Sequence, residues 1–248
     1  MVLKTETVRL IQNHRSIRKY LDKPIDDSIL HELLVAAQWA PSSHNVQAYS
    51  IIVVKNQDTK NTLSEYCGSQ EWVRTCPVFL VFCADLYRLK TACEMNESHY
   101  ALDGVENLIV GAVDAALSAE NVYISAKSYG LGGVMIGGIR NNSQKVVELL
   151  KLPEYVIPIV GMCLGYPSQE PWQKPRLPQY TVIHDEEYNT EIIREGLEEY
   201  DKIISDYYFR RTNGQKDKGW TELMADYLSN ERRLDLKEFI ISQGINLI

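Results

Sequence analysis

Apolar residues recur at helical spacing in two segments near the start of the chain. The spacing predicts a first helix over residues 5–14 and a second whose apolar positions run from 29 to 40. Asp26 or Asp27 can cap the free backbone N–H groups at the start of the second helix. Pro41 ends it, because proline cannot continue the backbone hydrogen bonding of a helix. The chain therefore opens with two helices.

Short apolar runs rich in β-branched residues follow, and they predict buried strands. One further strand is predicted where glycines flank an apolar run. After it, Asn142 can cap a helix. The predicted strands cover 49–54, 78–82, 134–139 and 157–164, and the helix covers 143–150. Interleaved helix and strand signals favour an α/β or α+β class.

One long helix is predicted over residues 104–129, with Gly130 as its C-terminal stop. Its apolar residues lie on most sides, which is expected of a helix buried by the core or by a second subunit. A proline-rich loop spans 167–178. After Asp185 the pattern becomes helical, with a loop at Asn213 and Gly214. We expect a single domain over 1–248, with 185–248 as a helical C-terminal extension.

The composition is that of a soluble globular protein. The 248 residues are 45% apolar and 24% charged, with a formal net charge of −7, which argues against a nucleic-acid partner. No apolar stretch approaches the roughly 18–20 residues of a membrane span, and the N-terminus shows no apolar signal core. The five cysteines form no C-x-x-C pair, which favours a reduced, cytoplasmic protein.

Several common catalytic signatures are absent from the sequence. It contains no P-loop, no H-E-x-x-H and no G-x-S-x-G, and its five histidines have no metal-ligand spacing, so no metal site is expected. The glycines at 130–133 resemble the start of a dinucleotide fingerprint. That fingerprint needs a strand before it and a helix after it, whereas here a helix precedes and a strand follows.

Four clusters could carry chemistry: 14–19 (HRSIRK), 41–47 (PSSHNVQ), 135–138 (MIGG) and 174–176 (KPR). The first and last place five cations in two short stretches of an acidic chain. Cations and serine hydroxyls bind phosphate groups through charge-assisted hydrogen bonds. Each cluster taken singly also fits an ordinary solvated loop, and spacing alone does not choose between these readings.

Together, these clusters and the segments around them resemble the flavin reductase and oxygen-insensitive nitroreductase family, in its NADPH-preferring branch. The resemblance covers most of the chain in the family's order. It is carried by HRSIRKY (14–20), SSHNVQAYSIIVV (42–54), GSQEWV (68–73), CADLYR (83–88), GAVDAALSAENVYISAKSYGLGGVMIGGIRNN (111–142), LLKLPEYVIPIVGMCLGYP (149–167) and KPRLP (174–178). It implies an α+β fold with a central mixed, mainly antiparallel sheet flanked by helices, and the long helix at a dimer interface.

The resemblance also implies a tightly but non-covalently bound FMN. Arg18 would stabilise the negative charge of the reduced flavin, the backbone N–H of Gly137 would reach flavin N5, and Lys174 and Arg176 would hold the phosphate. The implied cofactor-binding residues are His14, Arg15, Ser16, Ile17, Arg18, Ser42, Ser43, Gln70, Glu71, Trp72, Met135, Ile136, Gly137, Gly138, Lys174, Pro175 and Arg176. Ser42 and Ser43 would act across the dimer.

Two basic residues of the tail match family positions that meet the 2′-phosphate of NADPH. Arg211 matches well, whereas Lys216 stands where some members have arginine, and lysine lacks the bidentate fork. NADH is therefore an alternative donor. Lys216 alone fits a solvated cation equally well.

The expected activity is ping-pong two-electron hydride transfer from NADPH to nitroaromatics, quinones or free flavin. Two alternatives stay open. One is a flavin reductase that supplies reduced FMN to a partner protein. The other is a non-catalytic flavin-binding redox sensor, which would bind FMN without oxidising NADPH.

Overall fold

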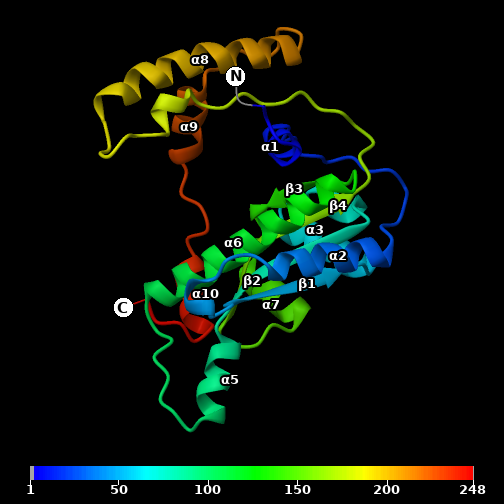
Figure 1. Cartoon of the computed structure of the whole chain (residues 1–248), viewed down its shortest axis with the longest axis vertical. Coiled ribbons are helices and arrows are strands. Elements are labelled where there is room, and N and C mark those ends of the chain that lie inside the picture. Colours follow the sequence, from blue (N-terminus) through cyan, green and yellow to red (C-terminus); the bar gives the residue numbers. More distant parts are fainter. Residues whose placement is uncertain (1–2, 248) are drawn as a thin grey trace. The chain divides into compact units, whose positions relative to one another are not determined.

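The computed structural model of the chain describes residues 3–247 and divides into two compact units. The first unit runs up to Pro171 and resumes at Arg233, and the second comprises Trp172–Arg232. The description of the chain as a single domain with an extension from residue 185 stays a prediction. Figure 1 labels the helices and strands of both units.

The first unit is built on a four-stranded antiparallel sheet with strand order β1-β2-β4-β3. Its strands are β1 (Tyr49–Val54), β2 (Val78–Asp85), β3 (Gly132–Ile136) and β4 (Val156–Gly165). The central strands β2 and β4 are almost wholly buried, whereas β1 and β3 form the two edges. The predicted α+β class is confirmed.

Helices cover both faces of this sheet (Figure 1). Alternate residues of β2 point to opposite faces, so Leu80 and Phe82 belong to one apolar core and Phe79 and Val81 to another. The first core is completed by α2 (Asp27–Gln38) and α6 (Val105–Ser128), and the second by α3 (Gln57–Tyr66), α7 (Ser143–Leu150) and α10 (Leu236–Ser242). The short helices α1 (Glu6–Gln12), η1 (Ser43–Asn45), α4 (Glu71–Thr75) and α5 (Tyr87–Met95) connect these layers.

The long helix α6 packs on the sheet through small residues. A Cβ added to Gly111 would lie 2.8 Å from the Cβ of Ala84 in β2, so the glycine permits the close approach. The buried positions of α6 include Ala115, Ala119 and Ala126. Helix α6 is also long and apolar enough to cross a membrane by length and composition alone, but it packs against α2 and the sheet as part of an apolar core.

Most predicted elements are confirmed, and two local expectations are wrong. The strand expected over 134–139 ends at Ile136, and residues from Gly137 to Arg140 form the 3₁₀ turn η2. Asn142 does stand at the N-cap position of α7, but its side chain makes no capping hydrogen bond, and its Nδ2 donates to the carbonyl of Tyr66 at 2.9 Å. At the second helix, Asp26 is the cap, since its carboxylate accepts from Ser28 N.

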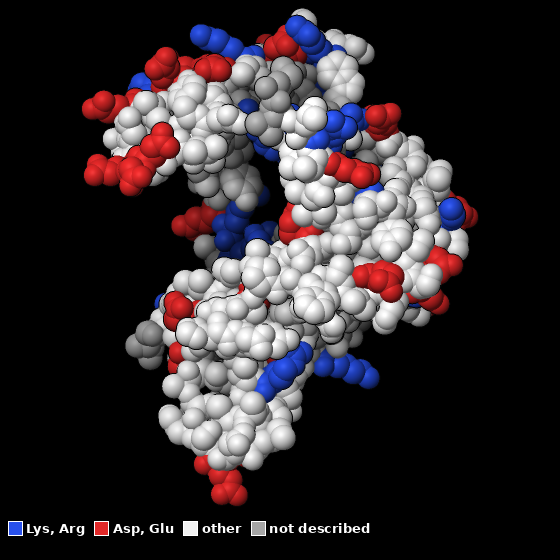
Figure 2. Space-filling model, viewed as in Figure 1, with Lys and Arg blue, Asp and Glu red and all other residues white. Residues whose placement is uncertain are grey.

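The second unit consists of η3 (Gln179–Thr181), α8 (Glu191–Arg211) and α9 (Trp220–Leu228). Gly196 of α8 packs tightly on Thr181, and Asp201 accepts a hydrogen bond from Thr221 N at the start of α9. Figure 2 shows acidic side chains gathered around the N-terminal part of α8 and basic ones at its other end. This distribution complements the dipole of the helix.

Candidate functional site

The first candidate cluster, residues 14–18, runs along the edge strand β3. Ile17 N donates to the carbonyl of Gly133 at 2.9 Å. A Cβ on Gly132 would come within 2.5 Å of Ile17 Cγ1, so glycine is needed for this approach. The segment therefore lies beside the start of β3, the strand that continues into the predicted site residues 135–138.

Two side chains of α6 hold the backbone of this segment by hydrogen bonds. The Tyr123 hydroxyl donates to Arg15 O at 3.0 Å, and Lys127 Nζ donates to Asn13 O at 3.0 Å and to Leu10 O. Burial raises the pKa of Tyr123 to about 12, so its hydroxyl stays a donor at neutral pH. The His14 ring lies 5.2 Å from the Tyr123 ring. The backbone of the cluster is thus held in place by α6.

Helix α4 brings two further predicted residues to the same edge. A Cβ on Gly138 would lie 2.6 Å from Gln70 Nε2 and 2.5 Å from Cys67 O, so Gln70 abuts the Gly137–Gly138 backbone. The Arg18 guanidinium lies 5.4 Å from the centre of the Trp72 ring, within reach of a cation–π contact. The structure therefore brings Arg18, Gln70, Trp72 and Gly138 together.

Gly137 presents an open backbone at the centre of this group. Unlike Gly138, it is not crowded by backbone atoms, since the nearest heavy atom to an added Cβ is the side-chain atom Arg140 Nη2, at an ordinary contact distance of 3.5 Å. Gly137 is half-buried and follows the buried Ile136, which anchors β3 in the core. A flat ring could lie against this backbone, which a side chain here would obstruct.

The site also contains hydrogen-bonding groups that the protein leaves unsatisfied. Within residues 3–247, Arg15 Nε and Trp72 Nε1 are buried without a partner, which is costly unless a ligand or water completes them. Arg18 is exposed and makes none of the hydrogen bonds or ion pairs of the described chain. This set of donors fits a polar, anionic aromatic cofactor such as FMN.

Two predicted residues of the site have other partners. Arg15 Nη1 donates to Glu170 at 2.9 Å and to Pro171 O at 3.1 Å, and Glu71 pairs with Arg74 on α4. Their assignment to the cofactor stays a prediction. Met135 is half-buried beside Ile136, and Ser16 keeps a hydroxyl without a described partner.

Ser42 and Ser43 lie at the opposite edge of the sheet from these residues. They precede β1, which is separated from β3 by β2 and β4. At about 4.8 Å per strand, the two edges are about 14 Å apart. Within one chain, the second candidate cluster does not join the group around Gly137.

One residue of this site was missed by the sequence reasoning. Arg233 Nη2 donates to Gly137 O at 3.0 Å, and its Nε donates to Asn141 Oδ1 at 3.1 Å, so it fixes the turn that carries Gly137. Arg233 lies in a charged stretch without periodicity, and no motif marks it. The chain re-enters the first unit at Arg233, and only this tertiary arrangement brings the side chain to Gly137.

A hollow of about 960 Å³ elsewhere in the first unit is a weaker candidate. It is lined by several charged residues, and three of its four lysine and arginine side chains already have partners. Lys55 pairs with Asp27, Arg74 with Glu71, and the buried Lys60 donates to Cys76 O at 2.7 Å. The fourth cation, Lys23, lies 4.0 Å from the centre of the Tyr166 ring, so the hollow offers a ligand a single cation without a hydrogen-bonding partner among the described residues.

In the second unit, tyrosines connect the KPR segment to the end of α8. Lys174 Nζ lies 5.2 Å from the centre of the Tyr208 ring, and the Arg211 guanidinium lies 5.8 Å from that of Tyr207. Arg211 Nη1 also donates to the Tyr207 hydroxyl at 3.2 Å, and the two tyrosine rings are 5.3 Å apart. Lys174 and Arg211 therefore share one aromatic platform.

The other predicted residues of this unit have simpler surroundings. The Tyr200 hydroxyl donates to Pro175 O at 2.8 Å and so holds the KPR segment against α8. Arg176 donates to the carbonyl of Lys174 at 2.9 Å. Lys216 is exposed, and only its backbone N–H is engaged, with Thr212 Oγ1. Convergence of Lys174 and Arg176 on the same group as Arg18 stays a prediction.

Two models of one known protein family match this chain. Residues 11–166 match the nitroreductase family, and residues 174–248 match the C-terminal domain of the same family. The chain belongs to the nitroreductase family. Both matched regions contain the clusters that carried the resemblance in sequence, which confirms that prediction.

Individual relatives share nearly the whole length of this nitroreductase-family chain. An FMN reductase (NADPH) of Bacillus subtilis is 40% identical over 97% of this chain and 98% of its own length. An oxygen-insensitive NADPH nitroreductase of Salmonella typhimurium is 37% identical, over 96% and 97%. The solved structure of B. megaterium NfrA2 matches with a TM-score of 0.97 at 40% identity, over 99% and 100% of the two chains. The predicted fold is therefore confirmed.

Proposed function

We propose that this protein is an FMN-dependent oxidoreductase that uses NADPH to reduce nitroaromatics, quinones or free flavin. The observation that carries the proposal is the open backbone of Gly137 beside Gln70, Trp72 and the unpaired Arg18. The proposal is also supported by two relatives, which are named FMN reductase (NADPH) and oxygen-insensitive NADPH nitroreductase. When bound, FMN would supply hydride acceptance and donation at its ring.

The residues of the chain would bind and orient this group rather than carry protons. Arg18 would offer a charge to the electron-rich end of the reduced ring, and the backbone of Gly137, whose carbonyl accepts a hydrogen bond from Arg233, would lie against the ring. Arg15 Nε and Trp72 Nε1 are donors that lack an acceptor in the described chain. We assign no side-chain general base, and we assign Lys174 and Arg176 to the phosphate.

Arg211 supports NADPH as the donor. Its guanidinium is held at the C-terminal end of α8 by the hydroxyl and ring face of Tyr207. A guanidinium that is fixed in this way can bind a phosphate through charge-assisted hydrogen bonds. Lys216 is a free point charge in the loop that follows, which suits a weaker, second phosphate contact, and NADH remains an alternative donor.

The surface of α6 supports a homodimer. The large apolar residues of this helix point outward at i, i+4, i+8 and i+12, and each is more than a third exposed: Val105 49%, Ile109 50%, Val113 50% and Leu117 37%. A continuous apolar stripe on a long helix is typical of a subunit interface. A second copy on this stripe would also bring Ser42 and Ser43 to the site that their own chain keeps at the far edge. We place the protein in the cytoplasm.

A flavin reductase that delivers reduced FMN to another protein is the second candidate. It is favoured by the relatives named FMN reductase (NADPH) and, in Vibrio harveyi, NADPH-flavin oxidoreductase. An open site over a planar ring discriminates poorly between free flavin and other flat acceptors. The two activities therefore differ in acceptor preference rather than in site residues.

An anaerobic stopped-flow experiment tests the proposal. Purified protein should be yellow, release FMN on denaturation, and lose its flavin absorbance within seconds of mixing with NADPH. Addition of a quinone, a nitroaromatic or free FMN should then restore the absorbance, and the relative rates rank the acceptors. Protein that binds FMN but is not reduced by NADPH or NADH would instead be a flavin-binding sensor.

A further inference from the structure

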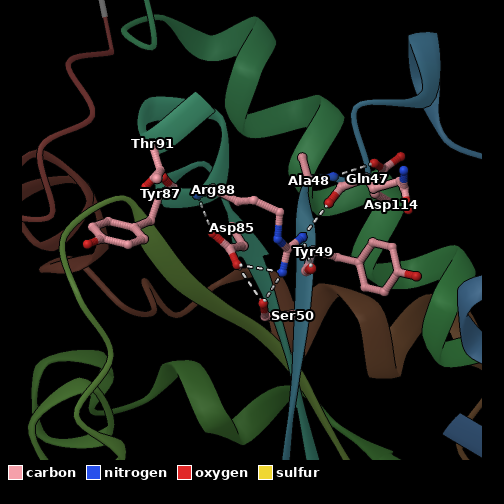
Figure 3. Close-up of polar contacts among 9 residues, drawn as sticks. All are labelled: Gln47, Ala48, Tyr49, Ser50, Asp85, Tyr87, Arg88, Thr91 and Asp114. Atoms are coloured by element: carbon pink, nitrogen blue, oxygen red, sulfur yellow. Dashed lines mark hydrogen bonds and ion pairs between the residues drawn. The ribbon is translucent and has the colours of Figure 1, made fainter. Parts of the chain in front are cut away.

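A buried carboxylate on α6 holds the loop that precedes β1. Asp114 is only 2% exposed. Its Oδ2 accepts hydrogen bonds from Ser42 Oγ at 2.6 Å and from Ala48 N at 2.9 Å, and Ser42 Oγ accepts one from Gln47 N at 2.8 Å. Figure 3 shows Asp114 reaching Ala48 from α6. One carboxylate oxygen therefore ties together both ends of the segment 42–48, which we call the serine loop.

The backbone of the serine loop requires such outside support. His44, Asn45 and Gln47 all have positive φ, at 47°, 57° and 50°. For residues with a Cβ, the left-handed conformation is disfavoured because the Cβ comes too close to the following carbonyl oxygen, least so for asparagine. Three such residues in a row of four make this shape unfavourable unless other interactions stabilise it. The two hydrogen bonds to Asp114 supply such stabilisation.

Arg88 supports the far end of the same loop (Figure 3). Its Nη1 donates to Gln47 O at 2.9 Å and to Tyr49 O at 3.1 Å, and its Nη2 donates to Ser50 Oγ at 3.0 Å. Asp85 pairs with Arg88 at 3.3 Å and holds its guanidinium in place. Arg88 thus ties the loop to β1, whereas Asp114 ties it to the helix.

The sequence of α6 is arranged to bring Asp114 to this position. Gly111 lies one turn earlier, and a Cβ there would lie 3.3 Å from Ala48 O as well as 2.8 Å from Ala84 Cβ. An ionised carboxylate on a face of a helix made mostly of alanine and glycine is costly to bury unless it is hydrogen-bonded. The serine loop supplies both hydrogen bonds that the described residues give to Asp114.

We propose that Asp114 is a positioning residue of the active site that acts on the flavin of the partner subunit through the serine loop. The inference rests on the proposed function, which supplies both the flavin and the dimer. Asp114 does not touch the flavin itself. It selects the loop conformation in which the Ser42 hydroxyl is held inside the loop and Ser43 is exposed, so the loop needs no ordering when FMN binds.

The two serines then have different roles. The hydroxyl proton of Ser42 is committed to Asp114, so Ser42 keeps only an acceptor lone pair for a ligand. Ser43 is exposed, and its hydroxyl has no partner within the described chain. Ser43 is therefore the hydroxyl that is free to donate to an anionic oxygen of the cofactor, while Ser42 shapes the loop.

The first test measures FMN affinity by quenching of flavin fluorescence as apoprotein is titrated. Asp114→Ala should weaken FMN binding at least tenfold. Asp114→Asn should stay within about threefold of wild type, because the amide oxygen can accept the same two hydrogen bonds. Glu106→Gln, a matched loss of charge on an exposed position of α6 without described partners, should bind FMN as wild type does.

A purely structural role would give a different pattern. If Asp114→Ala lowers the melting temperature of the apoprotein but leaves FMN affinity unchanged, the proposal is wrong. If Asp114→Ala does not fold, Ser42→Ala provides the same test, because it removes one hydrogen bond to Asp114 and the acceptor for Gln47 N. Folded Ser42→Ala protein with wild-type FMN affinity would also contradict the proposal.

Mixed dimers test whether the loop serves the partner. A dimer of one Asp114→Ala subunit and one Arg18→Ala subunit keeps one intact site if the loop acts across the interface, and should bind about one FMN. A wild-type subunit paired with the double variant keeps none and should bind FMN only weakly. The reverse result places the loop in its own subunit and overturns the proposal. Wild-type dimers without FMN would instead reject the proposed function.

Discussion

Arg15 and Arg18 lie three residues apart, yet their guanidinium groups have different surroundings. Arg15 is paired with Glu170 and with the carbonyl of Pro171, whereas Arg18 has only the face of Trp72. A cation that already has an anionic partner offers less to a ligand than a free one, because a new contact must replace the existing hydrogen bonds. The partners of each side chain, rather than its identity, decide how available its charge is.

Arg210 and Arg211 allow a test of whether a cation with an anionic partner is less available to a ligand than a cation without one. Arg211→Ala should raise the KM for NADPH about tenfold or more, because one charge-assisted contact to the 2′-phosphate is worth about 1.5–3 kcal/mol. The KM for NADH, which lacks that phosphate, should change less than twofold. Arg210→Ala is the matched control, since Arg210 is bound to Asp206, and it should alter neither constant. Equal changes for both donors would contradict the role of Arg211.

At the scale of elements, α6 combines three tasks on different faces. Its small residues pack on the sheet, its outward aliphatic residues form the exposed stripe, and Asp114, Tyr123 and Lys127 hold two segments of the candidate site. The position of this helix relative to the sheet therefore affects both the serine loop and the segment 14–18.

Gly111→Ala tests the close packing of α6. Alanine is favoured over glycine in a helix by about 1 kcal/mol, but here its Cβ would lie 2.8 Å from Ala84 Cβ. Overpacking of this kind costs about 1–3 kcal/mol. We expect a lower free energy of unfolding, measured by urea denaturation of the apoprotein. A more stable variant would show that α6 can move away from β2 without cost.

At the scale of the whole molecule, the sheet separates the two halves of the candidate site. Arg18 and Gly137 lie at the β3 edge, while Ser42 and Ser43 lie at the β1 edge. Under the proposed function, a second copy would have to bring the second cluster to the cofactor held at the first. The exposed stripe on α6 offers the surface for that copy.

Val113→Glu should disrupt the dimer. It places a charge at the centre of the exposed stripe of α6, where burial against a partner would leave it unpaired. Sedimentation velocity should show a monomer, and FMN binding should fall with it. Leu228→Glu, at another exposed apolar position on α9, should leave the mass unchanged. A Val113→Glu protein that remains dimeric would place the interface elsewhere.

The sequence by itself determined the local elements and the family. Runs such as YSIIVV match β1 residue for residue, and the long apolar helix begins and ends within one residue of its predicted bounds. These features follow from periodicity, capping and turn residues, which act between near neighbours. The four basic, serine and glycine clusters were also visible, because their composition is unusual for an acidic chain.

The tertiary structure decided which of these residues meet and which are already occupied. Arg233 at Gly137, Asp114 at Ser42 and Arg88 at Gln47 are each separated by at least 41 positions in sequence. No local pattern encodes such pairs, since they depend on strand order and on the approach of α6 at Gly111. Likewise, η2 interrupts β3 because Arg233 and the close contacts of Gly138 fix a turn there. Propensity alone would have continued the strand.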